Sequence, residues 1–282
     1  MSEDLSRLYR LVRWPEDPWS KEGRARYERA LERFRSLREH EWISDVTGRG
    51  TVRVLDLCGG TGIGGVALAK ALSEAGAKAV ELTVADLRSD ALEAAKRFSL
   101  EELGKEASTE LVDAREVHTL GREFDVALIY GYTTPHFSPW DLSRLMASVS
   151  ESLADDGVLL IEEQDRQYLI FYRGRYKDWL IEDLGPERLL ISVHKGYDPV
   201  RGVFKRASLD LLAREGPVVS EYCLWSLANL MTLSWLFFED VDFSPHAGRG
   251  MYDGIVLARR PRRKIRAEDL RTPKVLRESE GS

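Results

Sequence analysis

The hydrophobic positions of the chain follow two periods in turn, which predicts strands alternating with helices. Apolar residues recur at three- and four-residue steps from Ser20 to Leu37, as they do on one face of a helix. The apolar run TVRVLDL then begins at Thr51 and ends in a burst of glycines. Helical spacing returns from Gly62 to Ala75. A buried strand that leads through glycines into a helix is therefore the first clear unit of the chain.

Further strands of the same kind follow this unit. After TVRVLDL, four more apolar runs have the composition of buried strands: AVELTVADL, STELVDA, FDVALIYGY and GVLLIEE. Helical patterns separate most of them. Two later runs, EDVDFSPH and MYDGIVLARR, supply the last two strands. This alternation predicts an α/β fold, an open and mostly parallel sheet with helices on both faces.

The regular order breaks after residue 163. An aromatic-rich piece comes first, and two alternating runs follow it on either side of a turn at Asp198, Pro199 and Gly202, which predicts a β-hairpin. We interpret this stretch as an inserted substrate cap. The expected organisation is an N-terminal helical element (1–49), a ligand-binding core (50–163), the inserted cap (164–218), the last helix and terminal strands of the core (219–260), and a basic and polar tail (261–282).

Composition and charge narrow the classes of partner. The chain has 282 residues, 43% of them hydrophobic and 31% charged, with a net charge of −6, which disfavours a general nucleic-acid-binding protein. The basic cluster RRPRRKIR, from Arg259, is accordingly expected to be a solvated tail. Two cysteines, Cys58 and Cys223, lie far apart and outside any metal-binding spacing, so we expect a reducing, cytoplasmic location and no metal site.

Two further features concern the environment of the protein. The segment 222–238 carries no charge over its 17 residues, but polar residues interrupt it and no cationic anchors flank it. We expect a buried helix or an oligomer interface there, and no membrane span. Asn229 is the only asparagine, and Gln164 and Gln167 are the only glutamines, a scarcity that suggests a thermophilic source.

The glycine-rich stretch predicts an adenosine ligand. Gly60, Gly62 and Gly65 satisfy the spacing G-x-G-x-x-G, and Asp86 follows where an acid binds a ribose, so the motif alone also fits NAD. Asp56, just before the glycines, would repel a pyrophosphate and suits a ligand with an ammonium group. An acceptor for the adenine amino group follows the third strand, in the sequence VDA. An adenosine ligand with a cationic amino-acid end and no phosphate is S-adenosylmethionine.

These motifs together resemble a known family. VLDLCGGTG, VADLRSDAL, LVDARE, FDVALIYGY and GVLLIEE are similar to the successive strand-end motifs of class I, Rossmann-like S-adenosylmethionine-dependent methyltransferases. The resemblance is strong over residues 50–165 and weak in the terminal strands. It implies a seven-stranded sheet whose last strand is antiparallel.

The resemblance also implies a cofactor site. Asp56 and the backbone of Cys58 and Gly60 would hold the methionine end at the helix that starts with Gly62, although the family often has glycine where Cys58 stands. The remaining positions expected to contact the cofactor are Asp86 at the ribose, Asp113, Ala114 and Leu87 at the adenine, and Tyr130 beside the methionine.

Candidates for chemistry follow the fourth and fifth strands. His136, in GYTTPHF, is placed to act as a general base, although a loop histidine bonded to backbone is the alternative. Glu162 and Glu163 end the fifth strand, and one of them is expected to face the substrate and bind a cationic amine. We list Glu163 with His136 as catalytic candidates; the alternative is a carboxylate that points to solvent or to Arg166.

The predicted function is transfer of a methyl group to an amine or hydroxyl of a small metabolite, by direct displacement without a metal. Two other hypotheses remain open: a methyltransferase that acts on lysine or the N-terminus of a protein or peptide, and a non-catalytic partner subunit that binds S-adenosylmethionine. The expected partners are a small molecule and, through residues 222–238, other copies of the chain, but no nucleic acid and no membrane.

Overall fold

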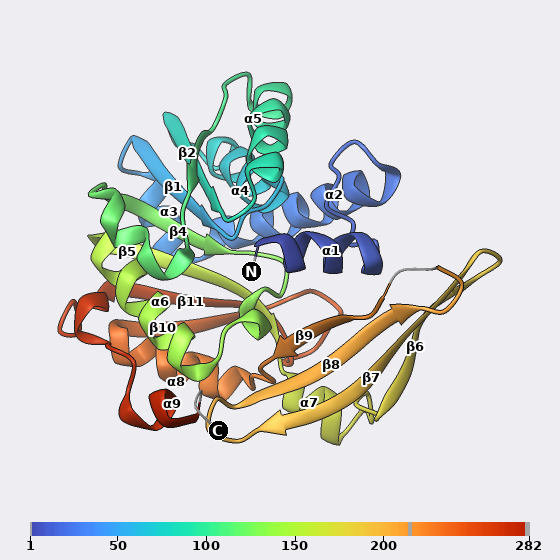
Figure 1. The fold of residues 1–282 in the computed structure, drawn as a ribbon. Coiled ribbons are helices and arrows are strands. Elements are labelled where there is room, and N and C mark those ends of the chain that lie inside the picture. The colour runs from blue at the N-terminus through green and yellow to red at the C-terminus, as the bar shows by residue number, and fades with distance from the viewer. Residues whose placement is uncertain (1, 214–215, 280–282) are drawn as a thin grey trace.

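The computed structural model describes residues 2–213 and 216–279, and its centre is a seven-stranded sheet (Figure 1). From one edge to the other, the strands of this sheet are β10 (Phe238–Pro245), β11 (Asp253–Pro261), β5 (Leu153–Gln164), β4 (Phe124–Ile129), β1 (Thr51–Leu57), β2 (Ala79–Asp86) and β3 (Ser108–Leu111). All neighbouring pairs are parallel except the two that involve β11, which is antiparallel to both β10 and β5. The predicted α/β class and the antiparallel last strand are confirmed.

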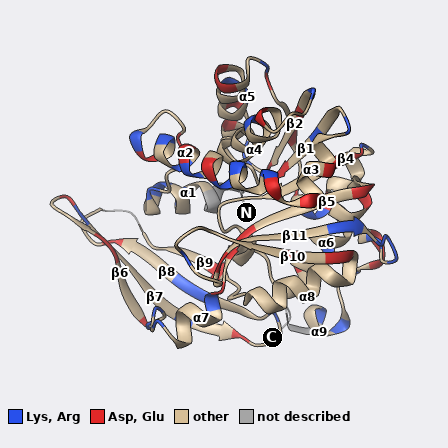
Figure 2. Ribbon diagram, turned by 180° about the vertical axis from the view of Figure 1, so that it is seen from behind, with Lys and Arg blue, Asp and Glu red and all other residues tan. Residues whose placement is uncertain are grey.

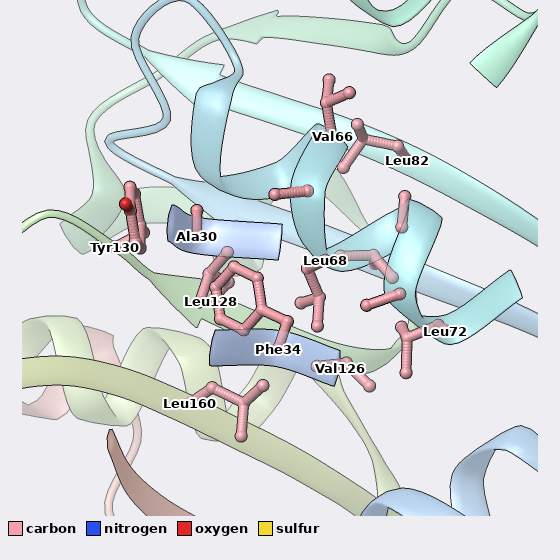
Figure 3. Close-up of a cluster of buried hydrophobic side chains, with 14 of the residues drawn as sticks. Ala30, Phe34, Val66, Leu68, Leu72, Leu82, Val126, Leu128, Tyr130 and Leu160 are labelled. Carbon is pink, nitrogen blue, oxygen red and sulfur yellow. The ribbon is translucent and has the colours of Figure 1, made fainter. Parts of the chain in front are cut away.

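Helices cover both faces of this sheet because its strands are apolar on both sides. One face packs against α2 (Lys21–Ser36), α3 (Glu41–Thr47), α4 (Ile63–Glu74) and α5 (Ser89–Leu103). Figure 3 shows part of this layer, in which Phe34 of α2 lies beside Leu68 of α4 and Leu128 of β4. The other face packs against α6 (Pro139–Ser152) and α8 (Leu227–Phe237), together with the short helices η2 (Ala114–Leu120) and η4 (Ala267–Asp269).

The insertion after β5 forms a second sheet. The short helix α7 (Arg166–Phe171) leads into four antiparallel strands in the order β6 (Trp179–Gly185), β7 (Arg188–Asp198), β8 (Val203–Asp210) and β9 (Val218–Tyr222). The β7–β8 hairpin is the one predicted from its turn residues. β6 and β9, which the pattern did not reveal, flank it on either side. The sheet extends away from the core, and α1 (Ser2–Val12) lies between the two (Figure 1).

The structure shows what the uncharged segment 222–238 and the basic cluster from Arg259 form. The first contains α8, and every helix among the described residues is too short or too polar to cross a bilayer. The basic cluster differs from the expected solvated tail, because its arginines pair with acids of the chain itself. Those ion pairs are Arg259–Asp45 at 2.8 Å, Arg260–Asp156 at 3.0 Å, Arg263–Asp155 at 2.5 Å and Arg266–Glu151 at 3.6 Å. Elsewhere, positive and negative residues are interspersed over the helices of the core (Figure 2).

Candidate active site

A cavity of about 590 Å³ lies between the core, α1 and the second sheet. One end of the cavity is formed by the loop that follows β1, with Asp56, Gly59 and Gly60. The opposite wall is the second sheet, which contributes Ser192 and Arg206 among others. Because the carboxyl ends of parallel strands form the ligand-binding edge of open α/β sheets, this cavity is the candidate active site.

The loop between β1 and α4 brings backbone close to any ligand in the cavity. Cys58, Gly60 and Gly62 have φ values of 53°, 54° and 81°, and α4 begins directly after Gly62. Glycine adopts such left-handed conformations without steric cost. Cys58 therefore has a side chain in a backbone conformation that favours glycine. This conformation is a physical reason for the glycine that the family often has at this position. A Cβ atom at Gly64 would lie 2.6 Å from Tyr130, so this helix packs directly on that ring.

Asp56 is a buried acid, and only one of its two carboxylate oxygens has a hydrogen-bond partner among the described residues. Its side chain is 0% exposed, Oδ2 accepts a hydrogen bond from the backbone N–H of Gly65 at 2.8 Å, and Oδ1 has no partner among the described residues. Burial raises the pKa of this carboxyl to about 7, against the lowering effect of the Gly65 hydrogen bond and of Arg26. A buried acceptor without a donor is costly. An ammonium group of a ligand in the cavity would supply both a donor and a compensating charge.

Arg26 lies in the same cavity, and no local pattern distinguishes it from the other arginines of α2. Its guanidinium carbon is 5.2 Å from the centre of the Tyr130 ring and 5.1 Å from that of Trp14, and it donates to the carbonyl of Pro15 at 3.4 Å. It forms no ion pair with a carboxylate among the described residues. A cation next to Asp56 makes this end of the cavity suitable for an amino acid, with an ammonium and a carboxylate.

Asp86 ends β2 beside the glycine loop, as predicted, and is already occupied by protein donors. Oδ2 accepts from the N–H of Gly60 at 2.8 Å, and Oδ1 accepts from the backbone N–H of Arg88 at 3.0 Å and from its Nε at 3.2 Å. The Arg88 side chain is held in turn by Glu16 at 2.7 Å, and its guanidinium carbon lies 4.8 Å from the centre of the Tyr9 ring of α1. Arg88 therefore links Asp86, the acid predicted to bind the ribose, to Glu16 and Tyr9 of the N-terminal segment.

Of the other residues predicted to contact the adenine or the methionine, one lines the cavity and three do not. Tyr130 lines the cavity, and burial raises the pKa of its hydroxyl to about 12. Asp113, Ala114 and Leu87 are not among the residues that line it. Asp113 caps η2 by accepting from the N–H of Arg115 at 2.9 Å, and it also pairs with that side chain at 2.7 Å. An adenine role for these three residues stays a prediction.

The two catalytic candidates also differ in position. His136 lines the cavity, its ring has no hydrogen-bond partner among the described residues, and it contacts the rings of Tyr9 and Tyr222. Burial and the charge of Arg166 lower its pKa to about 4, so the ring is neutral at pH 7. Glu163 is fully buried and does not line the cavity.

Both acids at the end of β5 are bound to protein groups. Glu163 accepts from Thr134, from the N–H of Gln164 at 2.9 Å and from Arg166 at 3.0 Å, and burial raises its pKa. Glu162 contacts Arg33, the N–H of Gly131 at 3.0 Å and His246 at 3.2 Å. These contacts favour a structural role for the pair, while the catalytic role of Glu163 stays a prediction.

Comparison with known proteins bears directly on this site. Residues 54–157, which contain the end of β1, the glycine loop, β2 to β4 and the start of β5, match the family described as "Methyltransferase domain". This part of the chain is a methyltransferase domain, and its fold is that of S-adenosylmethionine-dependent methyltransferases of known structure. Similar structures include an S-adenosylmethionine-dependent methyltransferase and an amino pentose methyltransferase with bound S-adenosylmethionine, in line with the cofactor that the acids at the strand ends predicted. No curated protein matches the chain.

Solved structures share the fold of this methyltransferase over almost their whole length. The PH0226 protein from Pyrococcus horikoshii OT3 is 18% identical, with 90% of this chain and 98% of that chain covered and a TM-score of 0.58. An S-adenosylmethionine-dependent methyltransferase from Clostridium acetobutylicum is 13% identical, with 92% and 98% covered and a TM-score of 0.59. The sugar N-methyltransferase KedS8 from a Streptoalloteichus species is 17% identical, with 93% and 94% covered and a TM-score of 0.54.

The residues of the methyltransferase fit this cofactor. The unpartnered oxygen of Asp56 could accept a hydrogen bond from the ammonium group of the ligand, and Arg26 suits the carboxylate of the same amino acid. Position 59 needs glycine because an added Cβ would lie 2.5 Å from Oδ2 of Asp56. A ribose role for Asp86 stays a prediction: Asp86 is not among the residues that line the cavity, and a ribose hydroxyl would have to share its carboxylate with Arg88. At Gly60 an added Cβ would lie 2.9 Å from the Arg88 guanidinium, so that side chain lies directly over the loop.

Proposed function

We propose that this methyltransferase transfers a methyl group to an amine of a small-molecule metabolite. The observation that carries the proposal is the single cavity that runs from Asp56 and the glycine loop to the second sheet, past a neutral His136. Residues of α1 and of the second sheet line the cavity, and its volume of about 590 Å³ is in the range of small-molecule sites. Two of the similar structures, a sugar N-methyltransferase and an amino pentose methyltransferase, support an amine acceptor.

In this proposal the chain holds both reactants and excludes water. Asp56 binds the ammonium and Arg26 the carboxylate of the cofactor's amino-acid end, and Asp86 accepts from its ribose. Bound S-adenosylmethionine supplies an electrophilic methyl group. Alignment of an attacking group in a dry site accounts for much of the rate of such reactions.

The state of His136 favours an amine over a hydroxyl. A hydroxyl group is a weak nucleophile that needs a general base with a pKa near the working pH. His136, with a pKa lowered to about 4, is a weak base. Its neutral ring can still accept a hydrogen bond from an amine N–H and so direct the nitrogen lone pair. An amine that enters the cavity uncharged needs no stronger base.

The second sheet provides polar groups for the rest of the substrate. Ser192, Ser208 and Arg206 line this wall, and the Arg206 guanidinium is held in place by Ser192 and by the carbonyl of Lys177 at 2.9 Å. Tyr222 and Gln164 add further hydrogen-bonding groups. Such a wall suits a polar, hydroxyl-rich molecule better than an apolar one.

The test is release of S-adenosylhomocysteine with a panel of small amines, matched alcohols and protein extracts. We expect turnover with amines, and mass spectrometry should show a gain of one methyl group on nitrogen. Turnover only with protein extract would contradict the proposal in favour of a protein or peptide substrate. If calorimetry shows binding of S-adenosylmethionine but no amine, alcohol or protein extract is methylated, the proposal is contradicted in favour of a non-catalytic subunit.

A further inference from the structure

An extra residue in β6, an edge strand of the second sheet (Figure 1), turns two consecutive acids toward the cavity. Ile181 of β6 lies opposite Ile191 of β7. The next pair is Asp183 with Leu190, so β6 has one extra residue, Glu182, between the two pairs. Side chains normally alternate between the faces of a strand, but an extra residue of this kind re-aims them. Glu182 and Asp183 therefore both line the cavity, whereas Ile181 points away from it and is 52% exposed.

The two acids differ in whether a cation neutralises them. Asp183 pairs with the Arg188 side chain at 3.2 Å. Glu182 forms no ion pair among the described residues, and its carboxylate accepts one hydrogen bond there, at Oε1 from the Ser192 hydroxyl. The other oxygen, Oε2, has no hydrogen-bond partner in the same part of the chain. Glu182 therefore lines the cavity with one carboxylate oxygen available to a ligand.

Ser192 of β7 holds that carboxylate in a fixed position. A hydroxyl group has one donor and two acceptor sites. The Arg206 guanidinium occupies the acceptor side of the Ser192 hydroxyl, with Nε at 3.1 Å and Nη2 at 2.8 Å from Oγ. The one O–H donor is therefore directed at Glu182. Ser192 and Arg206 are both buried, so a fixed polar network lies behind an exposed acid.

Arg206 of β8 is a buried cation whose direct partners are all uncharged. Besides the Ser192 hydroxyl, it donates from Nη1 to the Lys177 carbonyl at 2.9 Å and from Nη2 to the Ser192 carbonyl at 3.0 Å. These four bonds use four of the five N–H groups of a guanidinium, which leaves one on Nη1. A buried charge without a counter-charge is costly. Glu182, on the other side of the shared hydroxyl, compensates it, so this part of the wall is neutral as a whole.

We propose that Glu182 is a specificity-determining residue that binds a hydroxyl group of the substrate, at the end away from the methylated amine. A free acceptor on Glu182 and a free donor on Arg206 suit a group that both donates and accepts, as a hydroxyl does. An ammonium group only donates and would meet the charge of Arg206, and a carboxylate only accepts and would meet that of Glu182. The inference rests on the proposed function, because it takes the substrate to be a small amine in this cavity.

The proposal separates recognition of the substrate from its methylation. His136 and the glycine loop belong to the core, whereas Glu182 belongs to the second sheet, on the opposite wall of the cavity. A contact that is made equally in the bound substrate and in the transition state changes KM rather than kcat. Glu182 should therefore determine which amine is held, and not how fast a held amine is methylated.

The experiment compares four amines that share one ring: cyclohexylamine, 4-aminocyclohexanol, 1,4-diaminocyclohexane and 4-aminocyclohexanecarboxylate. They differ only in the group opposite the amine, which is hydrogen, a hydroxyl, an ammonium or a carboxylate. Calorimetry measures their binding to the complex of the full chain with S-adenosylhomocysteine, and KM and kcat are measured with S-adenosylmethionine. The wild type should bind 4-aminocyclohexanol about tenfold more tightly than each of the other three, through one charge-assisted hydrogen bond.

Three variants test the residues. Glu182→Gln keeps the size of the side chain but not its charge, and it should remove most of the preference for the hydroxyl through a higher KM rather than a lower kcat. Ser192→Ala releases Glu182 from its position and should act in the same direction. Glu187→Gln is the matched control, because it removes one charge from the turn between β6 and β7, outside the cavity lining, and it should keep the preference. Affinity for S-adenosylhomocysteine, which the core binds, shows that each variant is folded.

Other outcomes would overturn the proposal. Tightest binding of the carboxylate would make Arg206 an anion site, and tightest binding of the diamine would make Glu182 a cation site. Equal binding of all four amines, binding of none, or a hydroxyl preference that survives in Glu182→Gln would exclude this role for Glu182. If the hydroxyl preference is found in binding but no amine is methylated, here or in the panel above, amine transfer is wrong while the binding role of Glu182 stands.

Discussion

Replacing Asp56 by asparagine should stabilise the ligand-free methyltransferase while weakening cofactor binding. The carboxylate is fully buried and one of its oxygens has no partner, so its ionised form is penalised in the folded state. Asparagine has a similar shape, keeps an acceptor for the Gly65 N–H and carries no charge. The variant therefore removes the penalty and leaves the loop in place.

The magnitude follows from the pKa of the group. The pKa is 3.8 in its ordinary state and about 7 in the folded protein, a difference of about 3 units, and each unit corresponds to about 1.4 kcal/mol. Below pH 3.8 both states bind the proton and the penalty is absent. Between pH 3.8 and 7 the folded state holds a proton that the unfolded state has lost, so stability falls as pH rises. Above pH 7 the full penalty of about 4 kcal/mol is present.

The assay is thermal and urea unfolding of both proteins at pH 5 and pH 8.5. Asp56→Asn should gain about 2–4 kcal/mol at pH 8.5, or a few degrees in Tm for each kcal/mol, and clearly less at pH 5. S-adenosylhomocysteine should raise the Tm of the wild type more than that of the variant, since only the wild type offers a carboxylate to the ligand ammonium.

Asp125 on the neighbouring strand β4 is the matched control. It is also buried, but it accepts from the N–H of Arg53 at 2.8 Å and from its guanidinium at 2.9 and 3.0 Å, and these contacts hold its pKa low against the effect of burial. Asp125→Asn should therefore destabilise, by about 1.5–3 kcal/mol at pH 8.5. A lower Tm for Asp56→Asn at pH 8.5, or equal gains at both pH values, would refute the reasoning.

Three further predictions concern the cavity. Asp86→Ala should weaken S-adenosylhomocysteine binding by about 1–3 kcal/mol in calorimetry, through lost charge-assisted hydrogen bonds; unchanged affinity would mean that the ribose lies elsewhere. Arg88→Ala should instead tighten binding several-fold, because it frees one acceptor site on Asp86 and clears the space over Gly60; weaker binding would show that Arg88 holds the cofactor. His136→Phe should lower kcat by about tenfold through one lost hydrogen bond, and the wild-type pH profile should show no ionisation of this ring between pH 5 and 8; a step near pH 6.5 that is absent in the variant would contradict this.

Much of the core was predictable because its signals are local. A buried strand needs a run of apolar residues, and the tight turn after β1 needs glycine, so TVRVLDL followed by glycines determines both the strand and the loop. The acids at the strand ends, Asp56 and Asp86, could be placed at one edge because parallel strands all end there. The antiparallel last strand came from the family resemblance.

The contacts between side chains in the site could not be predicted from the sequence in the same way. Which of many arginines enters the cavity depends on how α1 and α2 pack against the sheet, so Arg26 and Arg88 carry no local signal. The same holds for Glu163. Its position at the end of β5 and the alternative of a contact with Arg166, three residues on, were both predicted, but its partner Thr134 comes from the segment after β4, and these contacts hold it away from the cavity.

The fold class, the expected cofactor and the position of the glycine loop could be predicted from the sequence, since each prediction depends on residues close together in the chain. Only the tertiary structure decided which charges face one another and which face of the second sheet lines the cavity. The alternation in β7 shows a half-apolar strand, but its two faces acquire different roles only when one is placed against the cavity and the other is left to solvent. Burial, and with it the pKa of Asp56 and the exposure of Ile181, is a property of the assembled elements.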